Sequence, residues 1–274
     1  MNERAVPFLV RIYLFMQNWF ERVLVGARGC FVGVWLGFLT RKLLHCVDEE
    51  YYTRTKRAYN QYPGEHDYHS NEWNLRGLLS WEERALNSYF RGCERLLLLG
   101  AGGGREVLAL RRLGYLVDAF EPHPDLVDVA NELLQAEGYE PSVHVVPRNE
   151  APTNTGKEYD GIIIGWGMYM HIQGKKHRIA LLRQLRAKTH KQCPILLSFM
   201  VRRDPSRSYK LARFMANMVG GPLRHEPAEI GDWLTPEYIH LFTEAEIAYE
   251  LAEGGFRLVY YNTDEYGHAV GTAV

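Results

Sequence analysis

The feature that most constrains the fold is a run of glycines between an apolar stretch and a helical pattern, in "RLLLLGAGGGREVLALRRLGY", residues 95–115. The run RLLLL predicts a buried strand, and EVLALRRL predicts a helix. Gly100, Gly102, Gly103 and Gly104 fill four of the five positions between them. Glycine loses more backbone entropy on folding than any other residue, so a simple tight turn does not explain so many. The pattern indicates a strand–turn–helix unit whose backbone approaches a ligand closely.

Further along the chain, short apolar runs continue to alternate with helical patterns. The apolar residues of 126–134 recur at i, i+3, i+4, i+7 and i+8, which is typical of a helix with one apolar face. Apolar runs without polar alternation, each followed by a helix, predict a parallel sheet that is covered on both faces. The runs expected to form these strands are LVDAF, VHVV, DGIIIG and PILLSF.

The last part of the chain has a different pattern. Thr243 and Glu246 form a capping-box signature at the start of a helix. Two strand-like runs follow, RLVYYN and YGHAVGTAV, with only TDE between them. So short a link allows a hairpin but no helical crossover. The predicted fold is therefore α/β: a doubly wound, seven-stranded, mostly parallel sheet with a C-terminal antiparallel hairpin and an N-terminal helical extension.

The predicted domain organisation follows from these changes of pattern. Residues 1–79 are expected to form a helical cap that ends in a polar, turn-rich segment. Residues 80–274 are expected to form the core, whose first helix would be capped by Ser80 with Glu83 three residues later. The connection at about 201–240 is much longer than usual and is predicted to be an insertion over the ligand-binding edge.

Composition narrows the class of protein. A chain of 274 residues with a formal net charge of −1 has no global basic field to gather nucleic acid, so no nucleic-acid partner is expected. The four cysteines show no paired spacing, which is typical of a reduced intracellular protein and indicates neither disulfides nor a metal site. No cleavable leader pattern is visible at the N-terminus. The expected location is cytoplasmic. The cysteines are Cys30, Cys46, Cys93 and Cys193.

One apolar segment, residues 23–40, leaves two readings open. Arg28 interrupts it, and the uncharged run of residues 29–40 is shorter than the ~18–20 residues that span a bilayer. A helix buried against the rest of the protein is favoured over a helix at a membrane surface. A peripheral membrane contact or a homodimer interface through the N-terminal helices stays open.

Three ligand classes use a glycine-rich turn of this kind. A phosphate-binding P-loop ends in Gly-Lys-Ser/Thr, whereas this loop ends in Gly-Gly-Arg-Glu. A dinucleotide fingerprint needs a small third residue, where this chain has Arg105, and Glu106 would bring a carboxylate toward the pyrophosphate. The third pattern, G-x-G-x-G, is met by Gly100, Gly102 and Gly104.

At these glycines the sequence resembles the class I S-adenosylmethionine (SAM)-dependent methyltransferases, in which spaced glycines follow the first strand and an acidic residue ends the second. Here "LVDAFEP" ends its strand with Glu121, which the resemblance implies would accept hydrogen bonds from both ribose hydroxyls. Ala101 and Pro122 lie in the same two motifs and are expected beside the cofactor. Leu98 departs from the family, which often has an acidic residue two places before the first glycine.

The resemblance extends over residues 80–274. It implies that Asn149 or Glu150, in "VVPRNEAP", lies near the adenine amine of the cofactor. It also implies that "EYDGIIIGWGMYMHI" forms the fourth strand, with Gly165 and Trp166 at its ligand-facing end. The implied cofactor is SAM, and the implied product is S-adenosylhomocysteine (SAH).

The acceptor side is predicted from residues near the ends of strands. Trp166, Tyr169 and His171 lie together after the fourth strand, and His240 lies in "TPEYIHLFT". His171 and His240 are the candidates for a general base, since imidazole titrates near neutral pH. A cap or surface role for His171, and a hydrogen bond to local backbone for His240, are the alternatives.

The N-terminal extension carries aromatic residues in "YYTRTKRAYNQY" that resemble the lead-in of several small-molecule methyltransferases. Tyr59 is the candidate for covering the cofactor and Tyr52 for contacting the acceptor, the alternative being that both pack against the core. His66 and His69 lack further ligands at suitable spacing, so no metal is expected.

The sequence thus predicts SAM-dependent O- or N-methylation of a small molecule by in-line displacement, for which aligning the reactants supplies much of the acceleration. A lipid- or quinone-like acceptor at a membrane surface, a non-catalytic cofactor-binding protein, and an NAD(P)-dependent oxidoreductase are the alternatives, the last being the least favoured.

Overall fold

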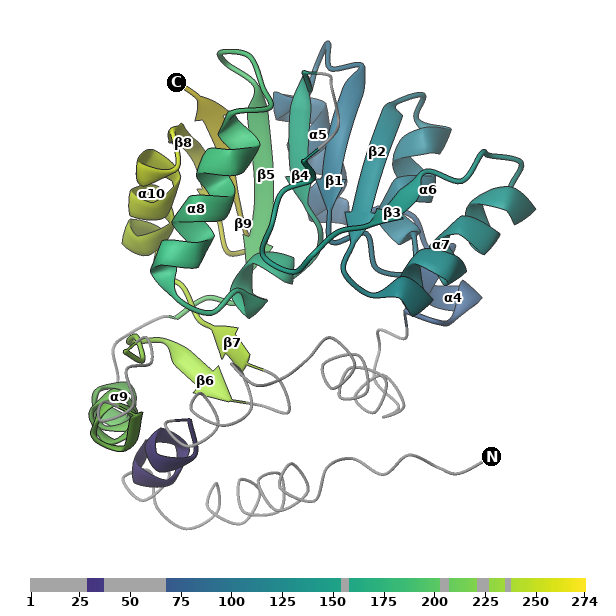
Figure 1. Cartoon of the computed structure of the whole chain (residues 1–274). Coiled ribbons are helices and arrows are strands. Elements are labelled where there is room, and N and C mark those ends of the chain that lie inside the picture. Colours follow the sequence, from purple (N-terminus) through teal and green to yellow (C-terminus); the bar gives the residue numbers. More distant parts are fainter. Residues whose placement is uncertain (1–28, 37–67, 154–157, 203–206, 221–226, 235–237) are drawn as a thin grey trace, which may run out of the picture. The chain divides into compact units, whose positions relative to one another are not determined.

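The structure, a computed structural model, describes residues 29–36, 68–153, 158–202, 207–220, 227–234 and 238–274 (Figure 1). The chain divides into two compact units. The larger unit consists of residues 65–201 and 242–274, and the smaller consists of residues 1–64 and 202–241. The domain boundaries drawn from the sequence stay predictions.

The larger unit contains a seven-stranded sheet in the order β3-β2-β1-β4-β5-β9-β8 (Figure 1). The pairs among β1 to β5 are parallel, whereas β9 runs antiparallel to both β5 and β8. The predicted α/β fold with a C-terminal antiparallel hairpin is therefore confirmed. The strands are β1 (Arg95–Leu99), β2 (Leu116–Glu121), β3 (Val143–Val145), β4 (Gly161–Ile164), β5 (Pro194–Phe199), β8 (Phe256–Asn262) and β9 (Gly267–Ala273).

Helices cover the two faces of this sheet. In Figure 1, α8 (Lys175–Arg186) and α10 (Glu244–Glu253) lie on one side of the strands, and α5 (Ser80–Tyr89) and α6 (Arg105–Arg112) lie on the other. The face of α5 and α6, together with α7 (Pro124–Ala136), holds a large apolar core. Two short helices complete the unit: α4 (Asn71–Asn74) and the 3₁₀ turn η1 (Met168–His171).

The start of α5 differs by one residue from the sequence prediction. Ser80 is the first helical residue and Leu79 is the N-cap, so the predicted cap at Ser80 is wrong. The backbone N–H of Leu79 donates a 2.6 Å hydrogen bond to Glu82. Glu82 is buried and Glu83 is exposed, so the inward carboxylate is one position earlier than the pattern indicated. The predicted capping box of Thr243 and Glu246 at α10 is confirmed.

The connection from β3 to β4 corrects a second expectation. The sequence predicted a helix after each parallel strand, but residues 146–153 and 158–160, the described part of this connection, contain no helix. A pocket of about 470 Å³ lies here, with Arg95, Asp118 and Phe120 of the sheet in its lining. Glu150 and Tyr159 of the connection also line it. The sheet beside this connection is therefore less completely covered than predicted.

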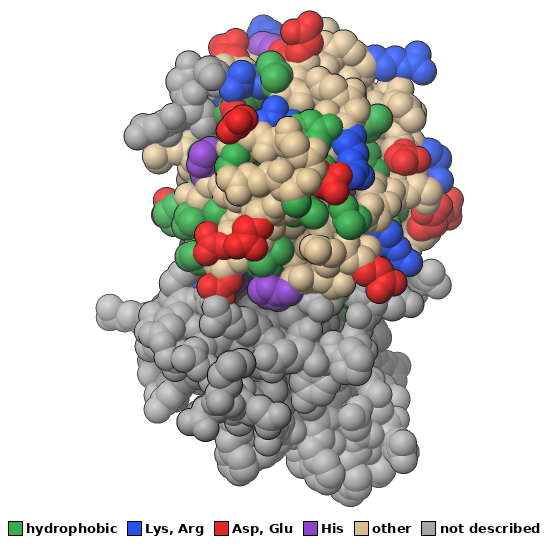
Figure 2. All heavy atoms as spheres, turned by 90° about the vertical axis from the view of Figure 1, so that its right-hand side faces the viewer, with side chains coloured by type: hydrophobic (Ala, Val, Ile, Leu, Met, Phe, Trp, Pro, Cys, Tyr) green, Lys and Arg blue, Asp and Glu red, His purple; other side chains and the backbone are tan. Residues whose placement is uncertain are grey.

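The surface at the β3 edge of the sheet carries charges of both signs. Figure 2 shows this side, where acidic and basic side chains are interspersed with hydrophobic ones. Among the described residues of this side, no continuous basic stripe of the kind that follows a nucleic-acid backbone is visible.

The described part of the smaller unit consists of a helical segment over residues 29–36, helix α9 (Arg207–Gly220) and an antiparallel strand pair. The strands are β6 (Asp232–Leu234) and β7 (Tyr238–His240). The segment 29–36 packs closely against α9, because a Cβ added at Gly33 would overlap the carbonyl oxygen of Ala212. The prediction of a helix within residues 23–40 is thus confirmed for 29–36, and the remainder lies outside the described residues.

The described helices differ from membrane-spanning helices. None of them combines the length and the apolar composition that a bilayer span needs.

Candidate functional site

The carboxyl ends of three neighbouring strands meet at one edge of the sheet. Leu99, the last residue of β1, pairs with Phe120 of β2 on one side and with Ile164 of β4 on the other. The residues that follow in each strand, Gly100, Glu121 and Gly165, therefore meet at this edge. The chain also leaves β1 toward β2 but enters β4 on the opposite side, so the strand order reverses here. Open α/β sheets bind their ligands at such a switch point.

The glycine loop leaves β1 in a left-handed conformation. Gly100, Gly102 and Gly104 have φ angles of +81°, +54° and +95°, which side chains disfavour. The N–H groups of Gly100 and Ala101 both donate to the carbonyl oxygen of Phe120, at 2.8 and 3.1 Å. These two hydrogen bonds hold the start of the loop against the end of β2.

Glu121 is buried at the end of β2 and faces the same loop. Its Oε2 accepts a 2.9 Å hydrogen bond from the N–H of Gly102, and its Oε1 accepts a 3.2 Å hydrogen bond from the N–H of His123. Glu121 is only 5% exposed. The predicted ribose-binding carboxylate is therefore held in a fixed position beside the predicted cofactor loop.

Two glycines of the site have no room for a side chain. A Cβ added at Gly165 would overlap the carbonyl oxygen of Gly100, so the turns after β1 and β4 are in backbone contact. A Cβ at Gly103 would overlap the carbonyl oxygen of Tyr68. These contacts explain why both turns are built from glycine.

Replacing Gly100 by alanine tests how much space this loop needs. A Cβ at Gly100 would stand 2.9 Å from the Cβ of Met168 in η1, whereas Gly138, which also has a φ of +81°, has no atom within 4 Å of that position. We expect G138A to destabilise the protein by about 1 kcal/mol through backbone strain alone. We expect G100A to lose a further ~1–3 kcal/mol from overpacking. Urea unfolding of both variants checks this, and equal losses would contradict the close contact.

Tyr68 is an aromatic neighbour of the loop that the sequence analysis missed. Its Cδ1 lies 3.0 Å from the position of a Cβ on Gly102. Its carbonyl oxygen accepts a 2.8 Å hydrogen bond from the side chain of Asn74. The available signal was an aromatic residue shortly before the core. Tyr52 and Tyr59, which were predicted for such a role, lie outside the described residues.

Trp166 belongs to a cluster of aromatic rings beside the end of β4. Its ring centroid lies 5.9 Å from that of Trp73 in α4 and 5.3 Å from that of Tyr266 in the β8–β9 turn. Tyr266 also stacks on Trp81 at 6.3 Å. The structure thus places Trp73 and Tyr266 beside Trp166, with Trp81 next to Tyr266, and the sequence analysis singled out none of these three.

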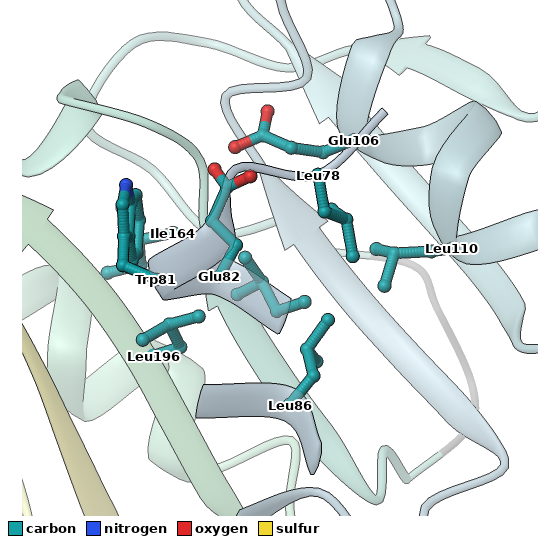
Figure 3. Close-up of a pocket in the computed structure, with 9 residues that line it drawn as sticks. Leu78, Trp81, Glu82, Leu86, Glu106, Leu110, Ile164 and Leu196 are labelled. Atoms are coloured by element: carbon teal, nitrogen blue, oxygen red, sulfur yellow. The ribbon is translucent and has the colours of Figure 1, made fainter. Parts of the chain in front are cut away.

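A buried charged cluster supports the glycine loop from within. Arg105 follows the loop directly and pairs with both carboxylate oxygens of Glu82, each at 2.7 Å. Glu106 lies 3.2 Å from the same guanidinium and accepts a 2.9 Å hydrogen bond from the N–H of Trp166. Figure 3 shows the carboxyl groups of Glu82 and Glu106 facing one another from α5 and α6. The dinucleotide hypothesis assumed that the carboxylate of Glu106 would face a bound pyrophosphate. In the structure this side chain is instead bound to groups in the interior.

Tyr169, predicted to contact the acceptor, lies in the interior. It is 1% exposed, and its hydroxyl donates a 2.7 Å hydrogen bond to Glu250 of α10. Arg178 of α8 pairs with the same carboxylate at 2.7 Å. This network holds η1, α8 and α10 together. The hydroxyl of Tyr169 thus has a partner in the interior. Its contact with an acceptor stays a prediction.

Four other predicted site residues lie after β2, at the end of η1 and after β3. Pro122 follows Glu121 directly and is half-buried, and His171 ends η1 and is half-buried. Asn149 and Glu150 are exposed in the segment after β3, which leaves the sheet beside β2 because Val145 pairs with Glu121. Their roles stay predictions.

His240 lies in the smaller unit, within a cluster of carboxylates. Its Nδ1 is 2.6 Å from Asp232 and 3.8 Å from Glu229, and the hydroxyl of Tyr238 donates a 2.6 Å hydrogen bond to Asp232. The donor atoms of Glu229, Asp232 and His240 lie within 4.8 Å of one another. The 2.6 Å between Nδ1 of His240 and Asp232 is a hydrogen-bond distance. It is shorter than the separation of about 3 Å between two ligand atoms of one tetrahedral metal ion. A carboxylate that orients an imidazole is typical of general bases, but the catalytic role of His240 stays a prediction.

The comparisons with known proteins give a fold. No family model matches the chain, and no curated protein matches it. Many solved structures do match. A SAM-dependent methyltransferase from Methanosarcina mazei superposes with a TM-score of 0.56 at 16% identity, over 72% of this chain and 99% of that one.

Two further matched structures are sugar methyltransferases. A SAM-bound amino pentose methyltransferase from Micromonospora echinaspora gives a TM-score of 0.51 at 14% identity, over 72% of this chain and 92% of its own. A sugar N-methyltransferase from a Streptoalloteichus species gives 0.51 at 13% identity, over 70% and 85%. At these identities the likeness shows a shared fold, the class I Rossmann-like fold of SAM-dependent methyltransferases.

Proposed function

We propose, from this shared fold, that the chain is a SAM-dependent methyltransferase that acts on a small-molecule acceptor by O- or N-methylation. The observation that carries the proposal is the position of Glu121, a buried carboxylate that faces the glycine loop across the ends of β1 and β2. A carboxylate at this place suits the paired hydroxyls of a ribose.

The residues present fit SAM and SAH. In this proposal the backbone of Gly100–Gly104 lies along the cofactor, Glu121 accepts hydrogen bonds from its ribose, and Asn149 or Glu150 binds the adenine. SAM, when bound, supplies a methyl group on a positively charged sulfur. The aromatic faces of Trp166 and Tyr68 favour a positive charge and exclude water from the reacting atoms.

The buried ion pair between Arg105 and Glu82 disfavours the alternative of a dinucleotide-binding site. The Rossmann fingerprint needs a small residue there for close helix–strand packing, whereas Arg105 is 3% exposed and its guanidinium donates to Glu82. A change to a small residue would leave Glu82 buried and unpaired, so the arginine is part of the fold.

The acceptor class is taken from the composition of the chain and from the matched structures. Two of the matched structures are sugar methyltransferases, so amino sugars form the first panel of acceptors. His171 and His240 are the proposed candidates for a base, which is needed where the acceptor is a neutral hydroxyl or a protonated amine. A small molecule is the proposed partner, and a lipid- or quinone-like acceptor would be tested on vesicles.

Isothermal titration with SAM, SAH and NADH tests the cofactor. We expect micromolar binding of SAM and SAH, and no heat with NADH. Binding of NADH alone would overturn the proposal. Turnover is then measured as SAH release with amino sugars, small phenols and vesicle-borne quinones. Cofactor binding without turnover on any acceptor would favour a non-catalytic cofactor-binding protein.

A further inference from the structure

A pair of buried carboxyl groups, those of Glu82 and Glu106, lies behind the glycine loop. Arg105 and Glu106 are the first two residues of α6, directly after Gly104. Glu82 reaches them from α5, and the two carboxyl groups face a cavity of about 10 Å³, the size of a single water (Figure 3). Such a cavity is too small for a substrate.

The charges in this cluster do not balance if both acids are ionised. Arg105 pairs with both oxygens of Glu82 at 2.7 Å and lies 3.2 Å from Glu106. The guanidinium is therefore matched to Glu82 as a bidentate pair. A second buried carboxylate would have no cation of its own, and an unmatched buried charge costs far more than a neutral, hydrogen-bonded acid.

The surroundings of Glu106 favour its neutral form at pH 7. Burial raises the pKa of Glu106 to about 8, and the negative charge of Glu82 and a hydrogen bond with it act in the same direction. The positive charge of Arg105 and the N–H of Trp166 lower the pKa. The ionisable side chains that act on Glu106 are thus Glu82 from α5 and Arg105 from its own helix, while the turn after β4 contributes a backbone N–H.

We propose that Glu106 is a positioning residue of the cofactor site. As a neutral acid it donates a proton to a hydrogen bond with Glu82 and accepts the N–H of Trp166, so that α5, the start of α6 and the turn after β4 are held together. Loss of this proton places a second negative charge beside Glu82, loosens the glycine loop and Trp166, and weakens cofactor binding. The inference rests on the proposed function for its ligand.

The first test is the affinity for SAH between pH 6.5 and 9.5, by isothermal titration of wild type, Glu106→Gln and Glu83→Gln. Glutamine reproduces the neutral acid at every pH, because its amide donates to Glu82 and its oxygen accepts from Trp166. With a pKa of about 8, about a tenth of wild type keeps the proton at pH 9, so its Kd rises about tenfold above the value at low pH. We expect less than about a twofold change for E106Q over the same range. The exposed control E83Q should follow wild type.

The second test needs no cofactor and uses urea unfolding at the same pH values and down to pH 4. Because the pKa of Glu106 is raised on folding, the folded chain binds more protons than the unfolded chain between about pH 4.5 and 8. This stabilising contribution is complete below pH 4.5 and is lost as the pH rises to about 8. Relative to wild type, E106Q should therefore gain stability across this window and level off above it.

The outcomes separate this inference from the proposed function. Unfolding curves whose difference does not change with pH would overturn the inference, and so would failure of E106Q to fold, because its amide mimics the neutral acid. A pH-dependent difference in unfolding with identical SAH profiles for wild type and E106Q would also overturn the positioning role. If SAH binds to none of the variants at any pH, the proposed function fails, while the unfolding series still decides whether Glu106 holds its proton.

Discussion

Replacing Glu121 by alanine is expected to weaken SAH binding by roughly 10²–10⁴-fold. The proposed contacts to the ribose are two hydrogen bonds to a charged acceptor, each worth about 1.5–3 kcal/mol. The loss of both is a change of about 3–6 kcal/mol in binding free energy, where every 1.4 kcal/mol is tenfold. The substitution also removes the acceptor for the N–H groups of Gly102 and His123. Isothermal titration measures the affinity, and urea unfolding measures how much of the loss comes from the loop.

Asp118→Ala provides the matched control on the same strand. Asp118 is a half-buried carboxylate of β2 that pairs with Arg95 at 2.8 Å and accepts a 3.0 Å hydrogen bond from Tyr159. Its partner Arg95 is the first residue of β1, at the opposite end of that strand from the glycine loop. We expect its removal to cost about 1 kcal/mol of stability and to leave SAH affinity unchanged within about twofold. Equal affinities for E121A and wild type would instead show that Glu121 does not bind the cofactor.

The main strands and the cofactor loop were predictable because their signals are local. The apolar runs of β1, β2, β4 and β5 have no polar alternation, and this pattern is typical of strands buried on both faces. The glycine loop and Glu121 each lie directly after such a run, so the strand prediction also placed them at one edge of the sheet. The terminal hairpin followed from a link that is too short for a crossover.

The corrected expectations have physical reasons. The segment after β3 contains Pro147 and Pro152 with several polar turn residues, which disfavour a helix, yet the general βα alternation suggested one. The start of α5 was displaced by one residue, a small error for a boundary but one that changes which glutamate faces inward. A one-residue shift turns a side chain by about 100° around the helix, and this brought Glu82 to Arg105.

The surroundings of the site could not be predicted because they depend on tertiary contacts. Glu82 and Arg105 are 23 residues apart in the chain, and Trp166 and Tyr266 are 100 residues apart. A periodic pattern of apolar residues indicates which face of a helix or strand is buried. It does not indicate which other element packs against that face. Arg105 could be seen to exclude a dinucleotide fingerprint, but the reason for an arginine there was visible only in the structure.

The buried pair of Arg178 and Glu250 leads to the second large expected effect, on stability. Each residue is 1% exposed or less, and Arg178 donates hydrogen bonds to both carboxylate oxygens of Glu250 and to the carbonyl oxygen of Ile172. We expect R178M or E250M alone to lower the free energy of unfolding by about 3–5 kcal/mol, because each leaves one buried charge without its partner. The double variant R178M/E250M should lose far less than the sum, since two methionines of similar volume carry no charge to bury.

A second ion pair on the same two helices gives the control for this effect. Arg183 of α8 and Glu253 of α10 are 3.1 Å apart, with side chains that are 61% and 45% exposed. Water and salt screen such a pair, so R183M and E253M should each cost less than about 1 kcal/mol, with little coupling in their double variant. Urea unfolding of both cycles measures the difference. A small, additive loss at Arg178 and Glu250 as well would mean that water screens this pair as it screens the exposed one.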